Sequence, residues 1–229
     1  MTSIRVNFKH RFPLFPLPGA VLLPHAVQPL QVIEPRYRAM IDAALDGSGQ
    51  IAVAMHDPVQ IGSEPVTAIR PVVCLGQVAH HESVPDGYEV LLHGVCRATI
   101  KELFDPEADR NWCEATLTPL ESLDEEPPTM PKVRDELYQL LVGEHLSTMR
   151  PVESIVQWFE REDVTTHALL ELIGSTLVQD EELRYQLLSE PEISRRSDMI
   201  RVELLRLDRM LGQAFQQRRE DYDHGIHWN

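Results

Sequence analysis

The sequence predicts an α+β protein whose first half is mostly β and whose second half is mostly α. Eleven of the 17 prolines precede residue 107, and prolines this dense exclude long helices but suit edge strands and turns. Beyond residue 131, apolar side chains recur with the 3.6-residue period of amphipathic helices. Charge divides the chain in the same way: residues 1–101 hold eight acidic and eight basic residues, so the whole excess of −15 lies in residues 102–229.

The first half contains a series of short apolar segments with the composition of strands. We expect them at residues 11–15, 27–33, 51–56, 71–82, 88–104 and 112–120, with a loop over 57–65. Pro29 places the second segment near a sheet edge or at a bulge. Pro85–Gly87 has the chemistry of a tight turn, with a fixed φ at the proline and left-handed freedom at the glycine. The two segments that flank this turn are therefore predicted to form a hairpin.

One helix interrupts the strands, and five more follow them. Glu34 and Pro35 begin the first helix, because proline suits the first helical position, and it runs to about Leu45. We expect a β domain over 1–121, an acidic proline-rich linker over 122–131, a helical domain over 132–220 and a frayed tail over 221–229. The apolar stripes of the five later helices are Val133/Leu137/Leu140/Leu141, Val152/Ile155/Val156/Phe159, Leu169/Leu172/Ile173/Leu177, Leu183/Leu187/Leu188 and Ile200/Leu204/Leu207/Leu211/Phe215.

Composition excludes several classes of protein. There is no run of about 18 apolar residues, so no membrane span or membrane partner is expected, and the N-terminus lacks the features of a signal peptide. Three widely spaced cysteines predict a reducing, cytoplasmic compartment rather than a disulfide scaffold. The acidic second half would repel phosphate backbones, so nucleic acid is not an expected partner.

Several motifs, in order, carry a resemblance to a known family. They are Phe12–Pro24 (FPLFPLPGAVLLP), Leu30–Met40 (LQVIEPRYRAM), Leu75–Glu82 (LGQVAHHE), Leu91–Arg97 (LLHGVCR) and Tyr185–Pro191 (YQLLSEP). The set resembles the N-terminal domain of Lon proteases over residues 11 to about 215. The match runs residue for residue through the family's Glu-Pro-Arg-Tyr entry into a helix.

The resemblance implies a PUA-like β pseudo-barrel with one helix, followed by a C-terminal α-helical bundle. It also implies a role in protein quality control. In full-length Lon this region captures unfolded or exposed polypeptide segments for an ATP-driven unfoldase and a Ser-Lys peptidase. We expect this chain to bind such segments and to be neither an enzyme nor cofactor-dependent, and a separate protease is a further candidate partner. No glycine is followed by lysine, as a phosphate-binding loop requires, and only three lysines exist.

The candidate peptide-binding residues lie in a loop, at a strand end and beside the hairpin turn. Val21, Leu22 and Leu23 in the loop 18–24 either meet client segments as an exposed apolar surface or pack on the barrel mouth as a lid. Met55 and Tyr88 complete the expected set, although cross-strand packing is the ordinary use of an aromatic at the position of Tyr88.

The family-motif residues Glu34, Pro35, Arg36 and Tyr37 have two readings. They either clamp a bound backbone or serve the start of the helix, and we favour the second use because charges at helix ends ordinarily have it. No metal site is expected. His80 and His81 are neighbours on a strand and point to opposite faces, and the cysteines lack paired spacing.

Three alternatives remain open. A cryptic hydrolase would cleave casein, and an RNA-binding module would need a basic patch. A scaffold or adaptor would dock onto a partner through its helical domain rather than through the barrel.

Overall fold

The computed structural model describes residues 5–61, 64–108, 110–121 and 129–223. The chain forms two compact units. The first comprises residues 1–126 together with Val178–Pro191, and the second comprises residues 127–177 and 192–229. The strands lie in the first unit and most of the helices in the second, so the predicted α+β class is confirmed. Among the described residues, no helix is both long and apolar enough to cross a membrane.

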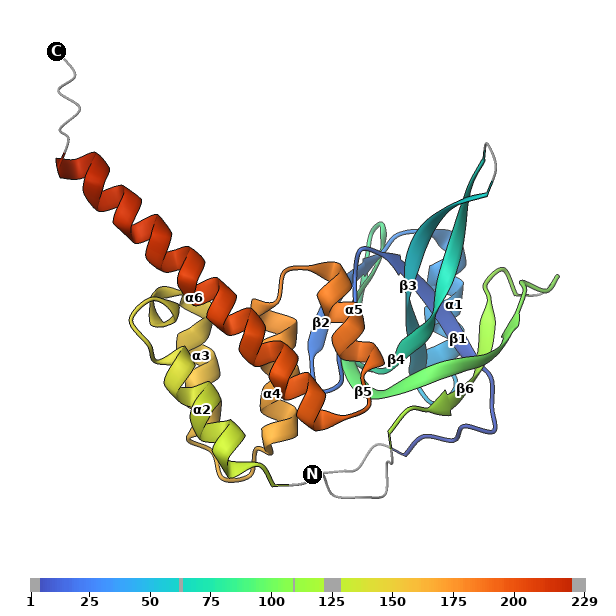
Figure 1. Ribbon diagram of the computed structural model, residues 1–229. Coiled ribbons are helices and arrows are strands. Elements are labelled where there is room, and N and C mark those ends of the chain that lie inside the picture. Colours follow the sequence, from blue (N-terminus) through green and yellow to red (C-terminus); the bar gives the residue numbers. More distant parts are fainter. Residues whose placement is uncertain (1–4, 62–63, 109, 122–128, 224–229) are drawn as a thin grey trace, which may run out of the picture. The chain divides into compact units, whose positions relative to one another are not determined.

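The strands of the first unit form one sheet that closes on itself (Figure 1). They are β1 (Phe12–Pro18), β2 (Val27–Val32), β3 (Gln50–Ile61), β4 (Glu64–Val84), β5 (Gly87–Phe104) and β6 (Glu114–Pro119). Their order is β2-β5-β4-β3-β1-β6, and β6 also pairs with β5. β5 permits this closure because it is long: Tyr88–His93 pairs with β2, and Ala98–Phe104 pairs with β6. β2 is left as an edge strand, as Pro29 predicts.

Alternating apolar side chains fill the interior of the barrel. Successive side chains of a strand point to opposite faces, so every second residue turns inward. The core cluster consists of Phe12, Leu14, Ala52, Ala54, Val73, Leu75, Cys96, Ala98, Ala115 and Leu117. Because these side chains occupy the interior, the outer surface of the barrel is the part that can meet another polypeptide.

One of the two hairpins confirms the sequence prediction, and the other contradicts it. β4 ends at Val84, which pairs with Gly87 at the start of β5, so the turn predicted at Pro85–Gly87 is confirmed. The loop predicted over 57–65 is wrong, because β3 continues to Ile61 and β4 begins at Glu64. Proline is tolerated in this arm because, as far as the described residues show, its two strands pair with each other alone, which leaves outer edges that need no N–H donor.

One helix lies against the barrel near the start of the chain. This helix, α1, spans Pro35–Leu45, with the proline in its first turn as predicted. Its buried residues are Tyr37, Met40, Ile41 and Ala44, which recur at helical spacing. The helix contacts β1, β3 and β5, so it anchors the barrel from one side.

The second unit is a helical bundle. It contains α2 (Pro131–Leu141), the short 3-10 helix η1 (Leu146–Thr148), α3 (Arg150–Phe159), α4 (Thr166–Leu177) and α6 (Ile193–Asp223). The predicted stripes supply its core, which includes Leu137, Leu141, Val152, Ile155, Leu169, Ile173, Ile200 and Leu204. α6 continues to Asp223, past the end predicted at residue 220. Residues 122–128 of the predicted linker and 224–229 of the predicted tail lie outside the described residues.

The helix α5 (Glu181–Ser189) belongs to the first unit, whereas the sequence prediction counted it in the helical domain. Its Tyr185 hydroxyl accepts a hydrogen bond from the backbone N–H of Val72 in β4 at 3.1 Å. The fully buried Arg97 of β5 donates to the carbonyl of Leu187 at 3.4 Å. Polar contacts of this kind leave no trace in apolar periodicity, so the period alone could not assign this helix.

Candidate functional site

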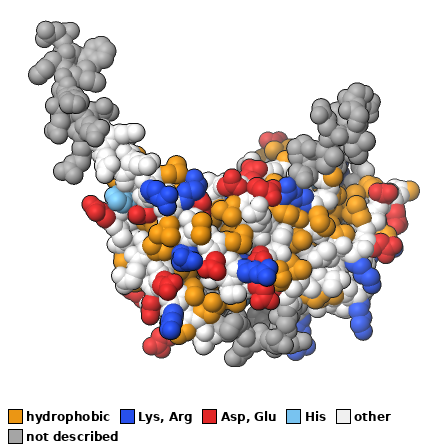
Figure 2. Space-filling view, in the orientation of Figure 1, with side chains coloured by type: hydrophobic (Ala, Val, Ile, Leu, Met, Phe, Trp, Pro, Cys, Tyr) orange, Lys and Arg blue, Asp and Glu red, His pale blue; other side chains and the backbone are white. Residues whose placement is uncertain are grey.

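Charges of both signs are interspersed on the molecular face that Figure 2 shows. Among the described residues in this view, acidic and basic side chains lie between apolar ones.

The loop 18–24 packs on the barrel. Val21, Leu22 and Leu23 are 6%, 1% and 1% exposed. The loop comes so close to β5 that a Cβ added at Gly94 would lie 2.1 Å from the Leu23 carbonyl oxygen. His25 donates its backbone N–H to the Gly94 carbonyl at 2.8 Å, which fixes the end of the loop. The three residues therefore pack on the barrel as a lid, and none of them presents a side chain to a client.

The Glu34–Tyr37 motif organises the start of α1. Arg36 Nε donates to Glu34 Oε2 at 2.9 Å, and the Arg36 guanidinium lies 4.4 Å from the centre of the Tyr37 ring. The Tyr37 ring packs against Phe15 of β1 with a centroid distance of 4.7 Å, and burial raises the pKa of its hydroxyl. These contacts support the interpretation that the motif serves the start of the helix.

Tyr88 and Met55 lie on different strands and have different partners. The Tyr88 hydroxyl donates to Asp42 Oδ1 of α1 at 2.6 Å, and this hydrogen bond raises the pKa of the phenol. The contact ties the hairpin to the helix. Met55 is half-buried in β3, where it pairs with Leu17 of β1. The structure does not bring the two residues together.

The two adjacent histidines point in different directions, as the strand geometry predicts. His80 lines an external groove, whereas the His81 ring lies 6.4 Å from the Tyr88 ring. Among the described residues, no three metal-ligating side chains gather at one point. Cys96 is buried in the barrel, and burial raises the pKa of its thiol to about 12. A thiol with this pKa is a poor nucleophile at neutral pH.

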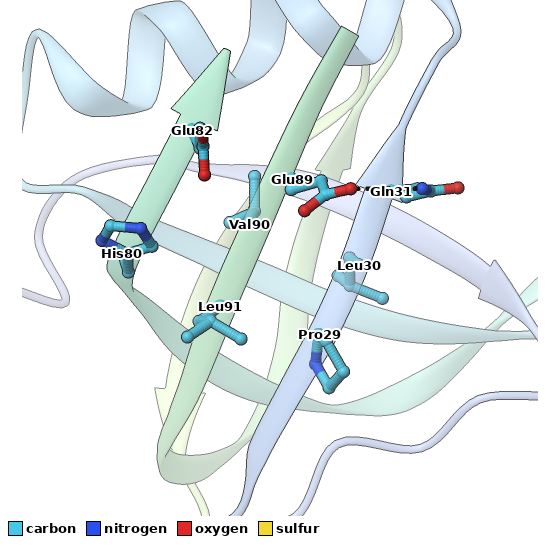
Figure 3. Close-up of a pocket in the computed structure, with 8 residues that line it drawn as sticks. All are labelled: Pro29, Leu30, Gln31, His80, Glu82, Glu89, Val90 and Leu91. Carbon is cyan, nitrogen blue, oxygen red and sulfur yellow. Dashed lines mark hydrogen bonds between the residues drawn. The ribbon is translucent and has the colours of Figure 1, made fainter. Parts of the chain in front are cut away.

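The exposed face of β2, β5 and β4 forms a groove of about 390 Å³ (Figure 3). Its side chains lie in two rows across the three strands. Pro29, Leu91 and His80 form one row, because Pro29 pairs with Leu91 and Leu91 with His80. Gln31, Glu89 and Glu82 form the other row in the same way. We call this surface the β2 groove.

Apolar side chains are exposed along the edge of the β2 groove. Val27 at the start of β2 is 57% exposed, Ile33 just after its end is 60% exposed, and Leu91 in the neighbouring strand is 36% exposed. Val27, Pro29, Gln31 and Ile33 are second neighbours, so three of the four positions at this spacing are apolar. Such a run of exposed apolar side chains on an edge strand is typical of a surface that contacts another chain.

The backbone of β2 offers hydrogen-bonding groups at the same edge. Antiparallel pairs alternate between hydrogen-bonded and non-bonded positions. Gly94 donates to the Ala26 carbonyl at 2.9 Å, so the alternation turns the backbone groups of Gln28 and Leu30 toward β5. Those of Val27, Pro29 and Gln31 face the outer edge. Within the described part of the chain, β2 pairs with β5 alone.

The sequence contains a pattern that indicates this groove, although none of the candidate peptide-binding residues lines it. Apolar side chains stand at 27, 29, 30, 32 and 33, so both faces of the strand are apolar although Pro29 marks it as an edge. A half-exposed edge strand ordinarily alternates apolar with polar residues. The departure from alternation identifies the exposed apolar surface, while the pairing with Leu91 required the structure.

Comparison with known proteins agrees with this architecture. The N-terminal domain of the Lon protease from the Mycobacterium avium complex superposes with a TM-score of 0.61 and 18% sequence identity, covering 83% of this chain and 96% of that one. The Lon N-terminal domain protein from Xanthomonas campestris superposes with a TM-score of 0.59 and 19% identity over the same shares. The chain thus has the α+β fold of Lon N-terminal domains.

The model of the ATP-dependent protease La (LON) substrate-binding domain family matches residues 11–206. The chain therefore belongs to this family, and the resemblance stated from its motifs is confirmed. No curated protein sequence matches it significantly.

Proposed function

We propose that this chain is a non-catalytic polypeptide-binding module that holds extended, apolar segments of other proteins along β2 and in the β2 groove. The observation that carries the proposal is the exposed apolar run on an edge strand. Membership of the substrate-binding family supports the same class of ligand. The client's backbone would pair with the outer edge of β2, and its side chains would contact Leu91 and Pro29.

Pro29 gives the proposed binding a reversible character. It lies at an outward-facing position of β2 and has no N–H, so an added strand loses one backbone hydrogen bond at this point. A continuous edge would pair more firmly and would also promote aggregation. Modest binding suits a module that must release its client to another machine.

The proposal that the module is non-catalytic draws on its few candidate nucleophile activators. All three lysines of the chain, Lys9, Lys101 and Lys132, are exposed. A Ser-Lys peptidase instead needs a lysine whose pKa is lowered by burial beside the serine. Incubation of the purified protein with fluorescent casein, with and without ATP, tests this part, and cleavage abolished by a point mutation in the chain would contradict it.

A binding assay tests the groove itself. Fluorescence anisotropy with a labelled, unfolded casein fragment should give saturable binding, and Leu91→Asp should weaken it about tenfold, because a buried apolar contact of about 1.5 kcal/mol is replaced by a charge. Leu103→Asp is the matched control, since Leu103 lies on the same strand and is 43% exposed. Equal affinities for the two variants would count against the groove.

The alternative of a scaffold that docks through the helical unit has a narrower basis. Trp158 of α3 is 42% exposed, and Val202 and Leu205 of α6 are 61% and 40% exposed. A Trp158→Ala variant that loses a cellular partner while it keeps casein binding would favour this function. Loss of casein binding in Leu91→Asp alone would favour the groove.

A further inference from the structure

Two carboxylates face each other across the strands of the β2 groove. Glu82 of β4 and Glu89 of β5 are direct cross-strand partners, and both side chains are exposed on the grooved face (Figure 3). Like charges directly opposite each other in a sheet destabilise it. Within the described residues neither carboxylate forms an ion pair, and Glu89 accepts one hydrogen bond, from Gln31 Nε2 at 3.4 Å.

The carboxylate pair lies one pleat away from the apolar contact. Leu91 and Glu89 are second neighbours on β5, which places them on the same face and about 6.7 Å apart along the strand. A client strand parallel or antiparallel to β2 has the same periodicity. If one of its residues contacts Leu91 and Pro29, its second neighbour on one side lies beside the row of Gln31, Glu89 and Glu82.

We propose that the β2 groove selects extended segments in which a lysine or arginine stands two positions from an apolar residue. The inference rests on the proposed polypeptide-binding function and names the class of segment that the groove prefers. A client cation would relieve the repulsion between Glu82 and Glu89. Adjacent strands lie about 4.8 Å apart, so a long basic side chain on a strand added to β2 extends over Gln31 to meet Glu89.

The shape of the groove and its charge together favour this occupant over a purely apolar one. The row of Pro29, Leu91 and His80 offers apolar contact to one client residue. The row of Gln31, Glu89 and Glu82 offers two negative charges and an amide. A client with apolar residues at both positions would bury the carboxylates without a partner, which is costly. A client with an acidic residue there would add a third negative charge.

A peptide series tests the inference on the full chain. The probes are acetylated, amidated peptides of about ten residues, long enough to cover the six residues of β2. Each has a central leucine whose two second neighbours are both Lys, both Gln or both Glu, so either strand direction gives the same pattern. We expect the Lys peptide to bind about five times more tightly than the Gln peptide at low salt, and the Glu peptide more weakly still. High salt should remove these differences.

Charge-matched variants separate the groove from the general acidity of the chain. Glu82→Gln with Glu89→Gln should abolish the preference for Lys, so that the Lys and Gln peptides bind this variant with equal affinity. Glu102→Gln with Asp105→Asn removes two exposed acidic residues at and just beyond the far end of β5 and should keep the preference. Equal affinities for all three peptides, or a preference that survives the first variant, would overturn the inference. Failure of the Gln peptide to bind at all would instead contradict the proposed function.

Discussion

Gly94 is the residue on which the lid over the barrel depends. Any side chain at this position would occupy the space of the Leu23 carbonyl, 2.1 Å from an added Cβ. Backbone cannot yield as the end of a flexible side chain can, so the loop 18–24 would have to lift. This explains in physical terms why glycine stands in the middle of the motif Leu91–Arg97.

The first prediction concerns this contact. Gly94→Ala should lower the free energy of unfolding by about 2 kcal/mol, the usual cost of overpacking. Gly47→Ala is the control, because the nearest atom to its added Cβ lies at 3.5 Å, an ordinary contact. Urea denaturation of both variants measures the effect. A Gly94→Ala protein as stable as the wild type would show that the loop does not pack as described.

Cys96 gives the chain a specific response to alkaline pH. Burial raises the pKa of its thiol from 9.0 to about 12 in the folded protein. The unfolded chain therefore releases this proton first, and the stability that depends on the neutral thiol is complete below pH 9 and is lost as the pH rises toward 12.

The second prediction follows from the direction of this pKa shift. The difference in unfolding free energy between wild type and Cys96→Ala should fall by about 1.4 kcal/mol between about pH 8 and pH 10. Urea denaturation at the two pH values provides the measurement, and Cys96→Ala cancels the titration of all other groups. A pH-independent difference would mean that the thiol ionises equally in both states.

At the scale of elements, α5 completes the sheet of the first unit. The pairing of β4 with β3 shifts register between Ile69 and Val73, which leaves Val72 at an irregularity in that pairing. The Tyr185 hydroxyl accepts the N–H of Val72, and the Arg70 guanidinium binds Glu182 at 2.7 Å and lies 4.3 Å from the centre of the Tyr185 ring. A short helix thus supplies the partner that a neighbouring strand would otherwise provide.

The third prediction tests this role of α5. Tyr185→Phe should leave the Val72 N–H without its acceptor and cost about 1 kcal/mol of stability. Hydrogen exchange of the Val72 amide, followed by NMR, should become faster in the variant. Tyr138→Phe is the control, because the Tyr138 hydroxyl makes no hydrogen bond to any described residue. Unchanged exchange at Val72 would exclude the proposed role of Tyr185.

Periodicity and turn chemistry made most elements predictable. The 3.6-residue repeat located the five later helices, and Pro85–Gly87 located the central hairpin, because both signals are local in the sequence. The β3–β4 arm was not predicted, because Pro58 and Pro65 are residues more typical of loops, although the outer edges of a sheet tolerate them. The membership of α5 depends on hydrogen bonds between residues about 90 to 110 positions apart, which no local pattern encodes.

At the scale of the whole molecule, the candidate site was only partly predictable. The sequence indicated an exposed apolar surface that binds client segments, and Pro29 placed the segment 27–33 near a sheet edge or at a bulge. It left open whether Val21–Leu23 would be buried, and it did not indicate that Leu91 would be exposed, because exposure depends on which strands pair. Strand register, set by the closure of the whole barrel, decides which face of β2 remains open.

Hydrogen–deuterium exchange of the full chain with and without a saturating unfolded casein fragment tests the central claim most directly. If clients add to the edge of β2, exchange should slow at the outward-facing amides of Val27 and Gln31 and remain unchanged in the helical unit. Protection confined to α2, α3, α4 or α6, with none in β2, would contradict the account.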